Sequence, residues 1–270
     1  MFTIKEVSDI TGVNSVTLRA WQRRYGLLNP ARTEKGHRLY SQADIEKIQS
    51  ILGWLEKGVA IGKVRPLLET ASLSVIEDAS IETENDIRKA VEQLLDALAN
   101  VNARTLDKQL TQLMKEYPLD VFDKQIAARV NGVINSSDNP LSAIQTSLWR
   151  NVLSERCLFQ VVKSRRRNNK PCVLISFDVI PSYRVWLQMM TLTEIGYSVT
   201  LLTNLSGKLS PLIVMMKELQ VKTLYIDGDN KLSRYDQEQL IHLIYEVECI
   251  VYCTGSINSI HPHLSEGKYK

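Results

Sequence analysis

The chain has 270 residues, of which 44% are hydrophobic and 23% are charged, a composition that excludes an intrinsically disordered protein and allows two or three domains. The formal net charge of +3 excludes a uniformly basic nucleic-acid binder, so a DNA-binding surface would have to be local. Residues 1–70 hold eleven Lys and Arg against seven Asp and Glu, whereas residues 71–100 hold two against seven. This change of sign predicts a domain boundary near residue 70.

The sequence lacks the signals of a membrane or metal-binding protein. No hydrophobic run is long enough to span a bilayer, and the amino terminus has no signal-peptide core, so we expect a cytoplasmic protein. The four cysteines show neither CxxC pairing nor ligand spacing with histidine, so we expect small apolar residues and no metal site at Cys157, Cys172, Cys249 and Cys253.

A helix, a tight turn and a second helix are predicted within the first 24 residues. Thr3 and Glu6 have the spacing of a capping box, which predicts the start of the first helix. Gly12 is placed to end that helix, and Asn14 or Ser15 can cap the next one.

Further helices are predicted up to residue 166. Ser41 and Asp44 have the spacing of a second capping box, and a short helix over 61–68 closes the first domain, residues 1–70. Acidic and Ser/Thr-rich residues 71–85 indicate a linker. Four amphipathic stretches over 86–166 then predict a four-helix bundle.

The carboxyl-terminal part has short apolar runs that alternate with helical stretches. These runs have the character of buried parallel strands and lie at 172–177, 197–203, 222–227 and 249–253. Their order predicts a doubly wound, flavodoxin-like α/β sheet over 167–258, followed by a tail at 259–270. Such a scaffold does not by itself establish a function.

The second helix carries side chains suited to duplex DNA. Arg19, Gln22 and Arg23 are spaced at i, i+3 and i+4, so we expect them on one exposed face. Arginine and glutamine can make bidentate contacts to guanine and adenine. Thr17 and Arg24 are better placed for phosphates, which provide affinity without sequence information.

The loop after this helix offers more donors. Arg32, His37, Arg38 and Tyr40 could lie along the DNA backbone, and Gly36 would permit the tight turn between them. A basic, solvated helix without a partner is the alternative. The agreement of helix and loop on one anionic target favours DNA.

The segment TLRAWQRRYGLLNPARTEKGHRLYSQADI resembles the winged helix-turn-helix of the MerR family of bacterial transcription regulators nearly position by position, and the resemblance covers residues 2–70. It implies a homodimer on a two-fold symmetric operator, and in many relatives the dimer distorts an over-long promoter spacer so that RNA polymerase can engage. The family's DNA-contacting positions fall on Arg19, Arg23, Arg38 and Tyr40.

The rest of the chain departs from the commonest members of that family, so metal sensing is not expected. Its layout resembles the subgroup with a cobalamin-binding module, in which a loop after the first strand carries Asp-x-His-x-x-Gly and the histidine coordinates cobalt. The matching loop FDVIPSYRVW has Asp178, but the histidine position falls on Ile180 or Pro181 and the glycine position near Tyr183. We therefore expect a degenerate module that keeps the fold without the cofactor.

This layout and the missing histidine are similar to those of enteric MerR-like regulators of curli and biofilm genes. The resemblance implies a transcription regulator controlled through its carboxyl-terminal domain by a protein partner. The alternative is a small-molecule sensor, for cobalamin or another ligand, with a cleft near Asp178, Thr203 and Thr254. We expect no enzyme activity, because the sequence shows no nucleophile–base arrangement.

Overall fold

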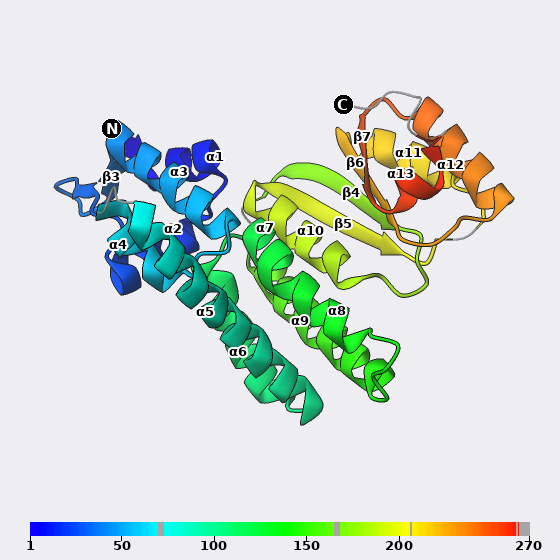
Figure 1. Ribbon diagram of the computed structural model, residues 1–270. Helices are drawn as coiled ribbons and strands as arrows, with labels where there is room; N and C mark the ends of the chain where they lie inside the picture. Colours follow the sequence, from blue (N-terminus) through cyan, green and yellow to red (C-terminus); the bar gives the residue numbers. More distant parts are fainter. Residues whose placement is uncertain (70–72, 165–167, 206, 263, 265–270) are drawn as a thin grey trace. The chain divides into compact units, whose positions relative to one another are not determined.

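The computed structural model describes residues 1–69, 73–164, 168–205, 207–262 and 264, and the side chains of all of these except 73–85. The chain divides into two compact units, Met1–Val152 and Leu153–Lys270 (Figure 1). This division lies inside helix α9 (Ser142–Ser164), whereas the sequence predicts boundaries after residues 70, 85, 166 and 258. The finer division into domains remains a prediction.

The first 69 residues form a helical head with a small antiparallel sheet. Strands β1 and β2 both pair with β3, which gives the order β1-β3-β2. The elements of the head are β1 (Phe2–Thr3), α1 (Ile4–Thr11), α2 (Ser15–Tyr25), β2 (Ala31–Arg32), β3 (Arg38–Tyr40), α3 (Gln42–Glu56), the 3₁₀ turn η1 (Ile61–Lys63) and α4 (Val64–Glu69). Helices α1 and α2 are the predicted helix-turn-helix, and the β2–β3 hairpin is its wing.

The head helices begin at the capping residues predicted from the sequence. Thr3 Oγ1 accepts from the backbone N–H of Glu6 at 3.4 Å, and Glu6 Oε2 accepts from that of Thr3 at 2.7 Å, so the first capping box is confirmed. The reciprocal bonds of the second box, at Ser41, are also present. Asn14 caps α2, because its Oδ1 accepts two backbone N–H groups of the first turn at 3.0 and 2.8 Å.

Helices continue through the remainder of the first unit and into α9. They are α5 (Leu73–Ala99), α6 (Ala103–Glu116), α7 (Leu119–Phe122), the π-helix η2 (Asp123–Ala127), α8 (Ala128–Ile134) and α9. Helix α5 starts at Leu73, so residues 73–85 of the expected linker are helical in backbone; residues 71 and 72 lie outside the described residues. Acidic, Ser/Thr-rich composition indicated a loop, but it does not forbid a helix, since propensity is a weak constraint.

The second unit contains the predicted parallel sheet. Its elements are β4 (Lys170–Ser176), α10 (Tyr183–Glu194), β5 (Tyr197–Thr203), α11 (Ser210–Glu218), β6 (Thr223–Gly228), α12 (Arg234–Glu246), β7 (Ile250–Gly255) and α13 (Ile257–Ile260). All four strands are parallel, in the order β5-β4-β6-β7. Strand β5 is thus added on one side of β4, whereas β6 and β7 are added on the other side, so the order of strand addition switches between β4 and β6.

Helices cover both faces of this sheet, which confirms the doubly wound arrangement. Val185, Met189 and Leu192 of α10 pack in one cluster with Leu174 of β4. The apolar residues of α11 and α12 pack in a second cluster on the other face of β4 and β6. Among the described residues, no helix is both long and apolar enough to cross a membrane.

Candidate nucleic-acid interface

Helix α2 has one face in the core of the head and another at its surface. Leu18 and Trp21 are completely buried. Arg23 is exposed on the other side, with Arg19 and Gln22 half-buried beside it. The face predicted to be exposed is therefore only partly at the surface, and the DNA contacts of these three side chains stay a prediction.

The wing is a hairpin closed by a turn from Thr33 to His37. The backbone N–H of Thr33 donates to the carbonyl of His37 at 2.9 Å, and that of Gly36 donates to Thr33 at 2.8 Å. Gly36 has φ +80°, the left-handed conformation that favours glycine. Arg32 donates to the Gly36 carbonyl at 3.2 Å, and both Arg32 and His37 are exposed.

Replacing Gly36 by alanine should loosen this wing. The added Cβ would meet no atom within 4 Å, so the cost comes from the backbone conformation alone, about 1 kcal/mol. Gly53 is a matched control, because its Cβ is equally unobstructed but it lies inside helix α3. We expect thermal unfolding to show a lower midpoint for Gly36→Ala and a higher one for Gly53→Ala; equal shifts would contradict this description of the turn.

Arg38 joins the wing to α2. Its Nε donates to Gln22 Oε1 at 2.6 Å. Burial lowers the pKa of Arg38, and so do the nearby positive charges of Arg32, Arg23 and Arg19. Arg19, Arg23 and Arg32 thus lie near enough to Arg38 to disfavour its positive charge, which is the arrangement expected of a surface that receives phosphates.

Two predicted contact residues lie inside the head. Thr17 and Tyr40 are fully buried, and neither hydroxyl has a hydrogen-bond partner among the described residues. Burial also raises the pKa of Tyr40. Because neither side chain reaches the surface in this structure, we remove both from the proposed set of DNA contacts.

Arg24 was predicted to contact phosphate, but it has a protein partner. Its Nη1 lies 2.5 Å from Oε1 of Glu116, the last residue of α6. The indole Nε1 of Trp21 donates to the backbone carbonyl of the same residue at 2.8 Å. The sequence does not indicate Glu116 as a partner of Arg24, because a contact over 92 residues leaves no local periodicity.

The loop that would hold cobalamin has another role in this chain. The Asp178 carboxylate accepts from the backbone N–H of Asp229 at 3.0 Å and from Asn230 Nδ2 at 2.7 Å, so it links two loops. Ile180 is 57% exposed and cannot ligate a metal. The described residues contain no group of three or more His, Cys, Asp and Glu side chains that could hold a metal ion.

The histidines lie away from this loop. His261 is buried, and its Nε2 accepts from the backbone N–H of Leu232 at 3.0 Å. His242 is in α12 and His37 in the wing, while His263 lies outside the described residues. None of the three described imidazoles takes the position of an axial ligand after β4.

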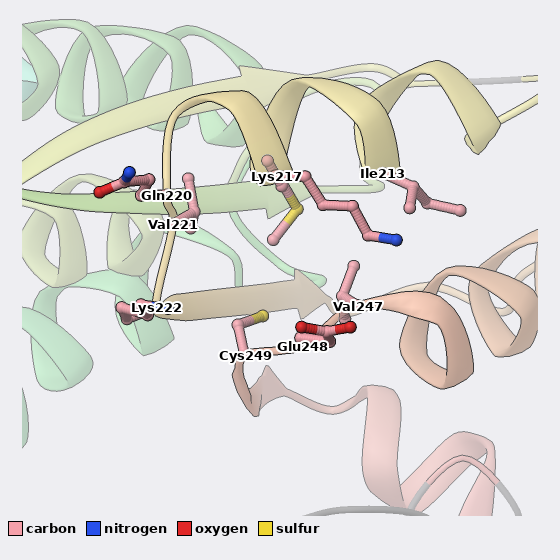
Figure 2. A pocket seen from close by; sticks show the side chains of 9 residues that line it. Ile213, Lys217, Gln220, Val221, Lys222, Val247, Glu248 and Cys249 are labelled. Carbon is pink, nitrogen blue, oxygen red and sulfur yellow. The ribbon is translucent and has the colours of Figure 1, made fainter.

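The second unit has a cavity of about 200 Å³ at the amino ends of β6 and β7 (Figure 2). This edge is opposite to the cleft predicted near Asp178, Thr203 and Thr254, which remains a prediction. Apolar and charged side chains line the cavity: Ile213, Met216, Lys217, Gln220, Val221, Lys222, Val247, Glu248 and Cys249.

Comparison with known proteins agrees with the DNA-binding geometry. Residues 2–71 match the family model for the MerR HTH family regulatory protein. The chain is 28% identical over 238 residues to the HTH-type transcriptional regulator MlrA of Escherichia coli, covering 88% of this chain and 93% of that protein. MlrA of Salmonella typhimurium is 29% identical over 241 residues, covering 89% of this chain and 93% of its own.

A shorter similarity concerns the HTH-type transcriptional repressor CarH of Myxococcus xanthus, which is 31% identical over 137 residues, 47% of this chain and 44% of that protein. These relatives are named as transcriptional regulators, a class of proteins that are not enzymes. The chain therefore carries a MerR helix-turn-helix domain at its amino end and is similar over most of its length to a named transcriptional regulator.

Proposed function

We propose that this protein is a sequence-specific transcription regulator that binds a two-fold symmetric operator as a homodimer. The observation that carries the proposal is the cluster of Arg19, Arg23, Arg32 and Arg38, which joins the exposed face of α2 to the wing. Helix α2 would read base edges in the major groove while the wing follows the phosphates. RNA polymerase at the promoter would respond to the bound dimer in the cytoplasm.

The experiment for this proposal is selection of duplexes from a random pool by the purified full chain. We expect the enriched sequences to contain an inverted repeat, because a symmetric dimer presents two equivalent recognition helices. Enrichment of single, unrepeated motifs would contradict the homodimer. Recovery of no common motif would contradict sequence-specific binding.

The second unit would receive the signal from a protein partner. Its strand order, β5-β4-β6-β7, corresponds to the first four strands of the flavodoxin-like order. Val179 and Ile180, which are 75% and 57% exposed, occupy the loop that carries the cobalt ligand in the cobalamin-binding module. A degenerate module with apolar side chains on this loop is suited to protein contact better than to a corrinoid.

A small-molecule sensor is the second candidate, and buried polar atoms at the carboxyl edge of the sheet favour it. Ser176 of β4 and Asp227 of β6 are paired in register, at the place in the sheet where the order of strand addition switches side. Ser176 Oγ and Asp227 Oδ2 are buried without a hydrogen-bond partner among the described residues, and burial raises the pKa of Asp227 to about 6. Unsatisfied groups at this place are what a ligand with hydrogen-bond donors would complete.

Thermal unfolding of the full chain distinguishes a cobalamin sensor from a degenerate module. We expect hydroxocobalamin to leave the unfolding midpoint unchanged, because none of the imidazoles that the structure describes lies in the loop directly after β4, where the module's cobalt ligand would stand. A midpoint that rises with cobalamin concentration would support the sensor and contradict the degenerate module. The variant Asp227→Asn provides the control, since a ligand seated at the carboxyl edge should lose its stabilising effect there.

A further inference from the structure

At the end of α6, the buried carboxylate of Glu116 contacts the recognition helix α2. Glu116 is only 5% exposed, although it is the last residue of its helix. Its carboxylate binds Arg24, and its backbone carbonyl accepts from the Trp21 indole. Burial and the neighbouring carboxylate of Glu116 also raise the pKa of Tyr25, the last residue of α2. Three side chains from the second half of α2 therefore converge on one residue.

This position is unfavourable for glutamate within its own helix. The carboxyl end of a helix carries a partial negative charge, which repels a carboxylate placed there. A buried carboxylate also loses its hydration and needs a partner of opposite charge. Arg24 provides that partner, so the contact with α2 accounts for a glutamate at this site.

Two more bonds connect the bundle helices to the head. The Tyr117 hydroxyl accepts from the backbone N–H of Ile61 at 3.4 Å. Gln125 Nε2 donates to the carbonyl of Glu56 at 2.9 Å. Gln125 lies in the π-helix η2, a rare local geometry that is common at functional sites. Of these connections, the one at Glu116 reaches the recognition helix itself.

We propose that Glu116 is a positioning residue that fixes the direction of α2 relative to the bundle. In a dimer, that direction determines how far apart the two recognition helices stand and therefore which half-site spacing they accept. Arg24 would serve this contact instead of binding a phosphate. The inference rests on the proposed function, because spacing has a meaning only when two heads share one operator.

The test uses the full chain and the duplex that the wild type selects from a random pool. Binding is measured to this duplex, to versions with base pairs added or removed between the half-sites, and to a single half-site. We expect Glu116→Gln to lower affinity for the selected spacing by about tenfold and to flatten the dependence on spacing, while half-site affinity stays unchanged. Glu92→Gln removes the same charge from an exposed position on α5 and should behave like the wild type.

A second variant covers the case in which Glu116→Gln does not fold. Arg24→Gln removes the counter-charge of the buried Glu116 carboxylate, but the amide that replaces the guanidinium can still donate a hydrogen bond to it. It should reproduce the loss of spacing preference and keep the wild-type salt dependence. A phosphate contact would instead reduce the slope of log affinity against log salt by about 1. The double variant should lose no more than either single variant, because both act through one contact.

Two outcomes would overturn the positioning role of Glu116, and a third would overturn the proposed function. A loss at the half-site as large as the loss at the full operator would overturn it, since Glu116 would then merely support the shape of α2. Identical behaviour of Glu116→Gln and Glu92→Gln would also overturn it. If the wild type selects no sequence at all, the proposed function fails, and this result is distinguishable from a failure at Glu116.

Discussion

Replacing Arg23 by alanine should relax sequence discrimination at one position of each half-site. Arg23 is the exposed member of the face that α2 presents beside Arg19 and Gln22. A bidentate arginine–guanine contact discriminates against the wrong base by about 1–3 kcal/mol, so the variant should bind matched and mismatched operators with more similar affinities. Competition binding with single-base-pair variants of the selected operator measures this difference.

Two further variants are controls for the assignment of a base contact to Arg23. Arg234 has a 94% exposed side chain on α12, and Arg234→Ala should leave discrimination intact. Arg38→Ala should weaken binding to all sequences and reduce the salt slope by about 1, if Arg38 contacts phosphate. The division of roles between helix and wing is wrong if Arg23→Ala and Arg38→Ala give the same profile.

Trp21→Ala should have the largest effect on stability. The side chain is completely buried and its indole donates to the Glu116 carbonyl, so the substitution leaves both a cavity and an unpaired acceptor. Removal of a buried tryptophan costs about 3–5 kcal/mol, a large part of the stability of a domain. Urea unfolding followed by circular dichroism would measure the loss.

The variant Trp21→Phe separates the two contributions. It keeps an aromatic ring in the core but lacks the N–H group, so we expect a loss of about 1–3 kcal/mol from the unpaired carbonyl and the smaller volume. Trp54 is only partly buried in α3, so Trp54→Ala should lower the free energy of unfolding by less than Trp21→Ala does. Equal losses of unfolding free energy for Trp21→Ala and Trp54→Ala would contradict the larger contribution of Trp21 to the core.

Local features of the fold could be predicted from the sequence because local chemistry determines them. The caps at Thr3, Asn14 and Ser41 follow from side chains that bond to backbone within three residues. The parallel strands follow from short apolar runs separated by helical periodicity. These signals need no knowledge of the tertiary structure.

Contacts between distant segments could not be predicted in this way. Glu116 lies 92 residues beyond Arg24, and nothing near either residue indicates the partner. The burial of Thr17 was accessible in principle, since Thr17 precedes Trp21 by one helical turn and shares its face. Its hydroxyl group suggested a phosphate contact, whereas packing of the head decided its position.

Genomic footprinting in the host should compare the full chain with a variant in which Arg19, Arg23 and Arg38 are all replaced by alanine. We expect the wild type to occupy a discrete set of sites containing an inverted repeat. The variant, at equal abundance and with an unchanged unfolding midpoint, should lose those sites. Retention of the same sites by the variant would contradict the assignment of DNA binding to α2 and the wing.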